Sequence, residues 1–279
     1  MTGLSRRLRE TFWRLAASGL VPRRWALGEL PKVPRQALSI EPPDRPLEIE
    51  IVSHCWRYHH LLSYQLSSLV LYPPERCRVV MTVFHAPEDH ETVETLEFFG
   101  RKGPGNVRWN WQPLSRPELF RRAIGRNRAA LGTSSDWIWF SDCDVIFHRG
   151  ALDTAAQLLR GRDDLLCFPR EHGVTDLLES DHPLLQEGAE TVGIVEIDPS
   201  DFEPEQRDKA VGGFQILRGD AARTLGYCNP VPFYQKPLTS WQKTYEDRTF
   251  RWILGTHGTP LEIPGLYRIR HLVKGRKTG

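Results

Sequence analysis

Apolar residues follow two different periods along the middle of the chain. Short, nearly continuous apolar runs rich in β-branched and aromatic residues predict strands that are buried on both faces. Longer runs, in which apolar residues recur every three or four positions, predict helices. The strands are expected at 47–53, 77–84, 106–111 and 137–141, and the helices at 59–71, 88–99 and 117–131. This alternation predicts an α/β fold with a mostly parallel sheet that is flanked by helices and joined by right-handed crossovers.

The pattern weakens after Phe168. Residues 171–209 carry many acidic side chains and several prolines, and within them only 192–197 has the pattern of a strand. A long segment with little regular structure inside a compact domain is typical of a lid over a site, so we expect a long loop here. Further on, a strand is expected at 212–217 after paired glycines, and helices at 220–225 and 245–254, each followed by a glycine.

The first 27 residues have a helical pattern of their own, followed by a linker with five prolines between 31 and 46. Apolar residues fall near one helical face and arginines flank it: Leu4, Leu8, Phe12, Leu15 and Leu20, with Arg6, Arg7, Arg9 and Arg14. An amphipathic helix of this kind suits the surface of an anionic membrane. It suits equally well a face packed on its own domain or on a second subunit.

Composition narrows the class of protein. The 279 residues are 40% hydrophobic, which is enough for a core, and the net charge of +2 argues against nucleic acid as the main partner. Five scattered cysteines form no C-x-x-C pair, so they predict a reducing compartment and neither a disulfide framework nor a zinc site. No run approaches the roughly 20 apolar residues of a membrane span. We therefore expect a cytoplasmic protein, which the N-terminal helix could hold peripherally on the inner face of the membrane.

Asp142 and Asp144 follow the apolar run 137–141, one residue apart. In open α/β sheets, ligands bind at the carboxyl ends of the strands. Two partly buried carboxylates at such a place need a positive partner. A divalent cation that carries phosphate oxygens fits, because Mg²⁺ and Mn²⁺ take one or two carboxylates together with phosphates. The alternative is a solvated turn in which one carboxylate caps a helix that begins near Arg149.

Four segments, in order, resemble parts of a glycosyltransferase of the GT-A fold. They are IVSHCWRYHHLLSYQLSSLVLYPP, GRNRAALGTSSDWIWFSDCDVIF, GGFQILRGDAARTLGYCNP, and Trp241 followed by Tyr245-Glu246-Asp247. The first segment resembles the family's base-binding strand and helix, and the second its arginine-asparagine helix with the metal-binding D-x-D. The third resembles the acceptor-side glycine strand, and the fourth a tryptophan that precedes a catalytic Glu-Asp pair. The chain thus resembles the inverting family 2 enzymes, with a C-terminal segment similar to β-1,4-galactosyltransferases.

The resemblance implies a Rossmann-like GT-A domain at 47–279 after an N-terminal helix and linker at 1–46. A nucleotide-sugar half at 47–168 would be followed by an acceptor half and tail at 169–279. The implied activity is that of a metal-dependent, inverting hexosyltransferase of polysaccharide biosynthesis. Its donor would be a nucleotide-diphosphate sugar, with a UDP-sugar favoured, and its acceptor a hydroxyl of a glycan or lipid-linked glycan.

The resemblance also implies roles for individual residues. Asp247 and Glu246 would be catalytic, with Asp247 as the general base, and Mn²⁺ or Mg²⁺ would be held by Asp144, Asp142 and His271. Donor contacts are implied for Ser53, Cys55, Arg57, His85, Arg126, Asp142, Lys274 and Arg276, and acceptor contacts for Gly213 and Trp241.

Two other functions remain open from the sequence. A nucleotidyltransferase shares the sheet and the paired aspartates, but it normally has a glycine-rich basic loop after its first strand, where this chain has Ser53-His54-Cys55-Trp56-Arg57. A catalytically silent membrane-binding module would use the N-terminal helix and have a decayed site. Individually, Glu246-Asp247 could be an ordinary acidic first turn and Trp241 a packing aromatic.

Overall fold

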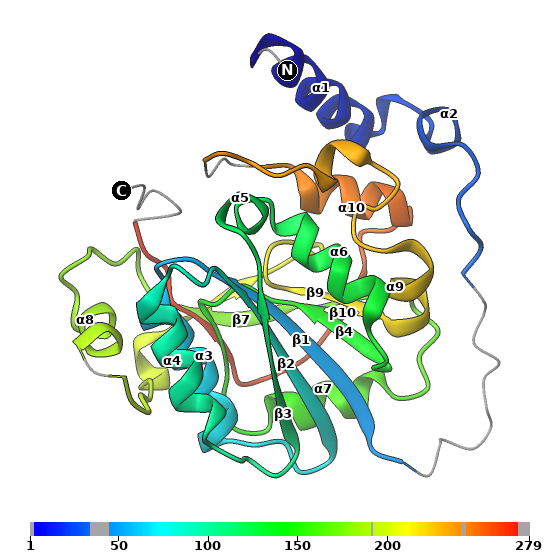
Figure 1. Ribbon diagram of the computed structural model, residues 1–279. Coiled ribbons are helices and arrows are strands. Elements are labelled where there is room, and N and C mark those ends of the chain that lie inside the picture. Colours follow the sequence, from blue (N-terminus) through cyan, green and yellow to red (C-terminus); the bar gives the residue numbers. More distant parts are fainter. Residues whose placement is uncertain (1–2, 34–44, 191, 241–243, 273–279) are drawn as a thin grey trace.

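A seven-stranded sheet organises the chain in the computed structural model, which describes residues 3–33, 45–190, 192–240 and 244–272 (Figure 1). Its strands are β1 (Leu47–Cys55), β2 (Cys77–His85), β3 (Val107–Pro113), β4 (Trp137–Phe140), β6 (Leu166–Pro169), β9 (Gln215–Arg218) and β10 (Thr259–Leu261). They lie in the order β10-β6-β9-β4-β1-β2-β3. The four strands β3, β2, β1 and β4 are mutually parallel, as are β6 and β10, whereas β9 runs antiparallel to both its neighbours. The predicted mostly parallel α/β sheet is confirmed.

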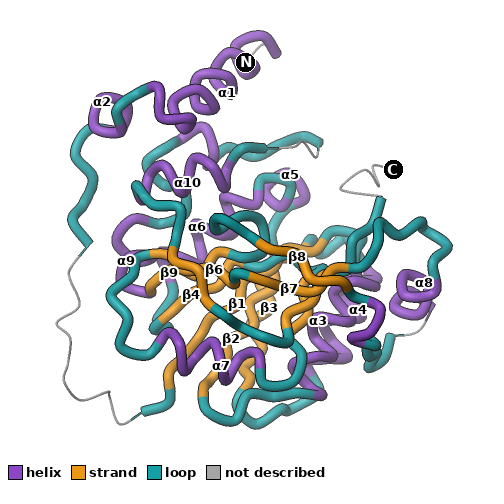
Figure 2. The backbone as a smooth tube through the Cα atoms, turned by 180° about the vertical axis from the view of Figure 1, so that it is seen from behind, coloured by secondary structure: helices purple, strands orange, loops and turns teal. Residues whose placement is uncertain are grey.

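Helices cover both faces of this sheet and enclose two cores (Figures 1 and 2). One face carries α3 (His59–Leu71), α4 (His90–Gly100) and α7 (Ala151–Leu159), and the other carries α5 (Arg116–Leu119), α6 (Arg122–Gly132), α9 (Gly219–Leu225) and α10 (Glu246–Leu254). Adjacent residues of β1 alternate between the cores, so that Ile51 packs in the first and Val52 in the second. This two-sided burial explains why the strands read as continuous apolar runs.

A second sheet, which the sequence did not predict, lies against the first. Its strands are β5 (Val145–Phe147), β7 (Glu171–Val174), β8 (Glu203–Gln206) and β11 (Leu266–Arg268), in the order β5-β11-β7-β8. Each has only three or four residues, too few to show a period in the sequence. Because β5 follows Asp144 directly, this sheet fixes the chain just after the paired aspartates.

The expectation of a long loop over 171–209 is wrong, because β7, β8 and α8 (Pro183–Glu190) lie within it. The predicted strand at 192–197 is also wrong. Its alternating pattern has another cause: Val195 and Ile197 are buried in the first core, and the Val195 amide donates to the Ser67 hydroxyl of α3 at 3.0 Å. The segment therefore packs on a helix instead of joining a sheet.

The single helix expected at 117–131 is two helices, α5 and α6, which meet at Phe120-Arg121. Ser115 and Glu118 form a capping box that begins α5, and Arg121 has non-helical backbone angles (φ −106°, ψ 83°) at the start of α6. The other predicted elements lie within a few residues of their expected bounds, and α3 matches them at both ends.

The N-terminal segment forms α1 (Gly3–Leu15), a π-helical turn η1 (Ala16–Leu20) and α2 (Arg23–Leu27). It lies on α10, at the top of Figure 1, where η1 and α1 both contact that helix. The predicted helix is thus present, with a break at Gly19, whose φ of +90° is not helical. Within the described residues, no helix has the length and apolar content needed to cross a membrane.

Candidate active site

Four predicted site residues line a cavity of about 270 Å³ at the carboxyl ends of β1 and β4: Cys55, Asp142, Asp144 and His271. Its wall includes His54, Cys55, Arg122, Asp142, Asp144 and His271. A larger hollow of about 690 Å³, beside Tyr72 and Asp153, contains none of the predicted site residues in its lining. The smaller cavity is the candidate site, because the carboxyl ends of parallel strands are where open α/β sheets bind ligands.

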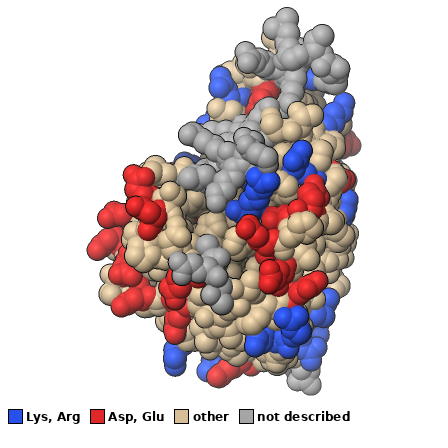
Figure 3. Space-filling model, turned by 60° about the vertical axis from the view of Figure 1, so that its left-hand side comes forward, with Lys and Arg blue, Asp and Glu red and all other residues tan. Residues whose placement is uncertain are grey.

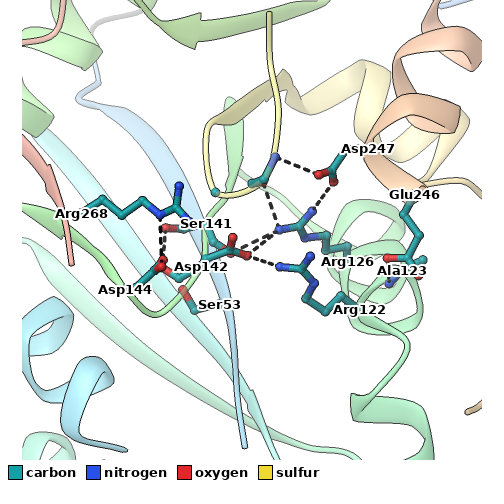
Figure 4. Close-up of polar contacts among 12 residues, drawn as sticks. Ser53, Arg122, Ala123, Arg126, Ser141, Asp142, Asp144, Glu246, Asp247 and Arg268 are labelled. Atoms are coloured by element: carbon teal, nitrogen blue, oxygen red, sulfur yellow. Dashed lines mark hydrogen bonds and ion pairs between the residues drawn. The ribbon is translucent and has the colours of Figure 1, made fainter. Parts of the chain in front are cut away.

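Asp142 is held by two arginines of α6 (Figure 4). Its Oδ1 accepts hydrogen bonds from Arg122 and, at 3.2 Å, from Nη2 of the fully buried Arg126. Burial pushes the pKa of Asp142 upward, but the charges of Arg122, Arg126 and Arg268 outweigh it and hold this pKa below its ordinary value. Asp142 is therefore ionised and already neutralised by protein groups.

Asp144 has a different environment. Its Oδ2 accepts from Nε of Arg268 at 3.1 Å, and the amide of Ile269 donates to its backbone carbonyl at 3.0 Å. Its Oδ1 is buried and has no hydrogen-bond partner. A buried carboxylate oxygen without a donor is costly unless something positive reaches it. Asp144 thus offers one oxygen to a ligand at the cavity.

The backbone around the two aspartates is fixed from α3. Nε2 of Gln65 donates to the carbonyls of Asp142 (2.9 Å) and Val145 (2.8 Å), and the Ser53 hydroxyl donates to the Gln65 amide oxygen at 2.7 Å. Ser53 is fully buried. The structure thus places Ser53, predicted to contact the donor, behind the aspartates, where it orients Gln65.

Asp247 lies at the start of α10, with its carboxylate 27% exposed. Its Oδ1 accepts from the Tyr227 hydroxyl (2.9 Å) and from Nη1 of Arg126 (3.2 Å), and its Oδ2 accepts from the Gly212 amide (2.9 Å). Each carboxylate oxygen can accept two bonds, so Oδ2 keeps a free lone pair. Arg126 therefore joins Asp247 to Asp142, although they are far apart in the sequence (Figure 4).

Glu246 points away from this network and into the protein, with 3% of the residue exposed. Its Oε2 accepts from the Ala123 amide at 3.2 Å, and its Oε1 lies 3.5 Å from Nη1 of Arg121. Burial raises the pKa of Glu246, although the charges of Arg121, Arg122 and Arg126 act in the opposite direction. Glu246 is a buried partner of the α5–α6 junction.

Gly213 approaches the paired aspartates closely. A Cβ at this position would lie 2.7 Å from the Asp142 amide and 3.0 Å from Cγ2 of Val145, so any side chain would collide. Its carbonyl accepts from the Trp139 indole at 2.9 Å. Gly213 thus lets the turn before β9 pack against the aspartates.

His54 is a site residue that the sequence reasoning missed. Both its ring nitrogens are buried without a hydrogen-bond partner, and the ring stacks on Phe84 at 5.1 Å. Burial, with the charges of Arg126 and Arg122, lowers the pKa of His54 far below its ordinary value, so the ring is neutral. The space for it depends on Gly125, where a Cβ would lie 2.2 Å from Nε2. A histidine at the end of a buried strand, on the same side as Val52, was the available signal.

His271 lines the same cavity as Asp144 and is 7% exposed. Its ring packs edge-on against Tyr58 at 5.1 Å, and its backbone pairs with Leu178. Within the described residues, no group of three or more His, Cys, Asp and Glu side chains is arranged to hold a metal ion by itself. The role of His271 as a metal ligand stays a prediction.

The remaining predicted donor contacts lie around the ends of β1 and β2. Cys55 lines the cavity, with its sulfur 3.3 Å from the Thr92 hydroxyl. Arg57 has a left-handed backbone (φ 57°), and its guanidinium lies over the Trp56 ring. His85 pairs with Cys55 across the strands, and burial lowers its pKa. Three predicted residues lie outside the described part of the chain: Trp241, Lys274 and Arg276.

No protein-family model matches this chain, and no curated protein sequence matches it. Solved structures do match it. The crystal structure of S. aureus TarS residues 1–349 in complex with UDP-GlcNAc has a TM-score of 0.51 at 12% identity, covering 84% of this chain and 61% of that one. The mannosyltransferase PcManGT from Pyrobaculum calidifontis, in complex with GDP-Man and Mn²⁺, has a TM-score of 0.48 at 13% identity, covering 96% and 69%.

This likeness concerns the fold. The chain spans about three fifths of the length of the TarS 1–349 chains that it matches. Its mixed α/β architecture, with a large, mostly parallel sheet between helices, is similar to that of solved glycosyltransferase structures. The predicted fold class, a mostly parallel α/β sheet flanked by helices, is thereby confirmed.

Proposed function

We propose that this protein is a metal-dependent, inverting glycosyltransferase. It would move a sugar from a nucleotide-diphosphate sugar, with a UDP-sugar as the favoured donor, to a hydroxyl acceptor. One observation carries the proposal. Arg126 bonds both Asp142, two residues before Asp144 with its unpartnered oxygen, and Asp247, in the first turn of α10. Side chains that could bind a diphosphate with its metal, and a carboxylate that could accept a proton, thus belong to one hydrogen-bonded network.

The described residues fit a divalent cation that arrives with the donor. Asp144 would supply Oδ1, and the prediction adds Asp142 and His271 from the same cavity wall. Mg²⁺ and Mn²⁺ commonly use one or two carboxylates and take their other ligands from phosphates and water. When bound, such an ion acts as a Lewis acid for the departing diphosphate. Arg122 and Arg126 add positive charge beside it.

Asp247 is proposed as the general base. Its carboxylate would take the proton of the acceptor hydroxyl while the acceptor oxygen bonds to the anomeric carbon and the bond to the diphosphate breaks. A single displacement of this kind inverts the anomeric configuration. Tyr227, Arg126 and the Gly212 amide orient the carboxylate, and the free lone pair of Oδ2 remains for the proton. Glu246 is proposed to support the helix start, since it is buried against Arg121.

The proposal is tested by thermal shift with UDP, GDP and their sugar conjugates, each with Mn²⁺ or with chelator. A ligand that binds only the folded state raises the melting temperature. We expect at least one nucleotide to stabilise the protein more with Mn²⁺, and Asp144→Ala to abolish that difference. The control is Asp201→Ala, an exposed aspartate on a surface turn.

The outcomes separate the candidate functions. A metal-dependent shift that survives in Asp144→Ala would contradict the metal site. In turnover assays with a nucleotide sugar and an added acceptor, release of nucleoside diphosphate together with a glycosylated acceptor supports glycosyl transfer. Release of pyrophosphate from a nucleoside triphosphate would indicate a nucleotidyltransferase instead. No response to any nucleotide would favour the silent membrane-binding module.

A further inference from the structure

The N-terminal segment exposes apolar side chains to an unusual degree. Five of the ten large apolar side chains that are exposed in the described structure lie between residues 8 and 25. We call them the N-terminal apolar face: Leu8 (64% exposed), Phe12 (49%), Leu15 (46%), Leu20 (73%) and Trp25 (74%). Positions 8, 12 and 15 share one side of α1. Clustered apolar exposure of this kind marks an interaction surface.

Packing on the protein's own domain uses a different side of the segment. Trp13 contacts Trp252 of α10 at 6.4 Å between ring centroids, and Ala16 and Ala17 are buried. Arg23 donates to the carbonyl of Ile253 at 2.6 Å. These contacts fix the segment to α10, and none of them is made by a residue of the N-terminal apolar face.

Arginines accompany this face. Arg9, Arg14, Arg23 and Arg24 are exposed along the same segment. In Figure 3, blue side chains lie beside tan ones at the upper end of the molecule, and blue and red side chains are mixed over the rest of this face. Apolar side chains edged by arginines match an anionic lipid surface, which offers hydrocarbon to the first and negative charge to the second. Self-association through this face would instead bring the arginines of two copies together.

The segment also contacts the helix that bears the proposed base. The Arg14 guanidinium lies 5.5 Å above the ring of Tyr245, two residues before Asp247. The contacts of Trp13 and Arg23 reach the other end of α10. The N-terminal segment thus contacts residues near both ends of α10, the helix that bears the proposed base (Figures 1 and 2).

We propose that residues 8–25 dock this protein on an anionic bilayer, and that the acceptor is an amphiphile held in that bilayer. The amphiphilic acceptor rests on the proposed glycosyl transfer, whereas the docking on a bilayer does not. Docking through α1 keeps Asp247 near the membrane, so the acceptor's hydroxyl head reaches the site while its hydrocarbon stays in the lipid.

Vesicle flotation of the full chain tests the docking. We expect the protein to float with phosphatidylcholine vesicles that contain phosphatidylglycerol, and much less with phosphatidylcholine alone. Leu15→Ser combined with Trp25→Ser should lower the bound fraction more than tenfold. Arg9→Glu or Arg24→Glu should each lower it about fivefold or more, the ratio equivalent to roughly 1 kcal/mol per basic residue. Leu131→Ser is the matched control, since Leu131 is 44% exposed on α6.

Failure of the full chain to float at low salt would overturn the docking, and so would equal binding to both vesicles. A dimer that Trp25→Ser dissociates, without vesicle binding, would assign the face to a second copy instead.

Alkyl glycosides then test the acceptor, in a long-chain form within vesicles and a short-chain form in solution. The double variant should lose transfer to the long-chain form and keep transfer to the short-chain form.

Equal transfer to the long-chain form by the double variant would overturn the amphiphile proposal. Absence of transfer to either form, with metal-dependent nucleotide binding also absent, would contradict the proposed function. Vesicle flotation does not depend on that result, so the two failures are distinguishable.

Discussion

The two acidic pairs, Asp142 with Asp144 and Glu246 with Asp247, divide their work in the same way. All four carboxylates lie near an arginine, but Asp142 gives one oxygen to two arginines of α6, and Glu246 is buried against Arg121. Asp144 and Asp247 each keep an oxygen that can accept a further bond: Oδ1 of Asp144 at the cavity, and Oδ2 of Asp247 beside the Gly212 amide. Neighbouring carboxylates with different surroundings take different roles. The surroundings of each carboxylate, and not its place in the sequence, therefore distinguish the two members of a pair.

The largest expected effect is on the turnover number, through Asp247 of the Glu246-Asp247 pair. Asp247→Asn keeps the size of the side chain but cannot take a proton, so the turnover number should fall by about 10²–10⁴-fold. Nucleotide binding should survive, because the substitution leaves Asp142 and Asp144 in place. Asp208→Asn, at a 79% exposed carboxylate, is the control. A normal rate in Asp247→Asn would remove the distinction between Asp247 and Glu246.

Arg126 connects the two pairs, and its loss should destabilise both. Arg126→Gln removes the fully buried arginine that Asp142 and Asp247 share, and breaking a buried ion pair typically costs about 3–5 kcal/mol of unfolding free energy. Arg128→Gln, on the same helix but half exposed and 3.7 Å from Glu118, should cost about 1 kcal/mol or less. Urea unfolding measures both. Equal losses would mean that Arg126 does not link the pairs.

The smallest effect concerns acid stability. The folded pKa of Asp142 lies below its ordinary value of 3.8, so its contribution to stability is present above that pH and is lost as the pH falls through the folded pKa. Asp142→Asn lacks this group. Its unfolding free energy should therefore decline less steeply than that of the natural protein below about pH 4. Parallel declines of the two proteins in this range would contradict the pKa direction.

Much of the fold follows from sequence periodicity, because strands buried on both faces and helices such as α3 leave strong local signals. The paired aspartates were found for the same reason, since they interrupt the apolar run of β4. Their partners were not found. Arg122 and Arg268 lie on different elements, and nothing local distinguishes them from exposed arginines. His54 likewise becomes a site residue only through the approach of Gly125.

Glu246 is a residue whose burial could not be predicted from the sequence. An acidic residue in the first turn of a helix is normally exposed, and the adjacent letters Glu246-Asp247 gave no means to separate the two. Only the packing of α10 against the α5–α6 junction buries one and exposes the other. The three- and four-residue strands of the second sheet were missed because so few residues carry no period.

The anomeric configuration of the product is the most direct measurement of the central claim, that Asp247 activates the acceptor for a single displacement. NMR of the product made from an α-linked nucleotide sugar reports it without any variant. A single displacement with Asp247 as the base gives a β-linked product. An α-linked product would contradict the single displacement and the role of Asp247 as its base.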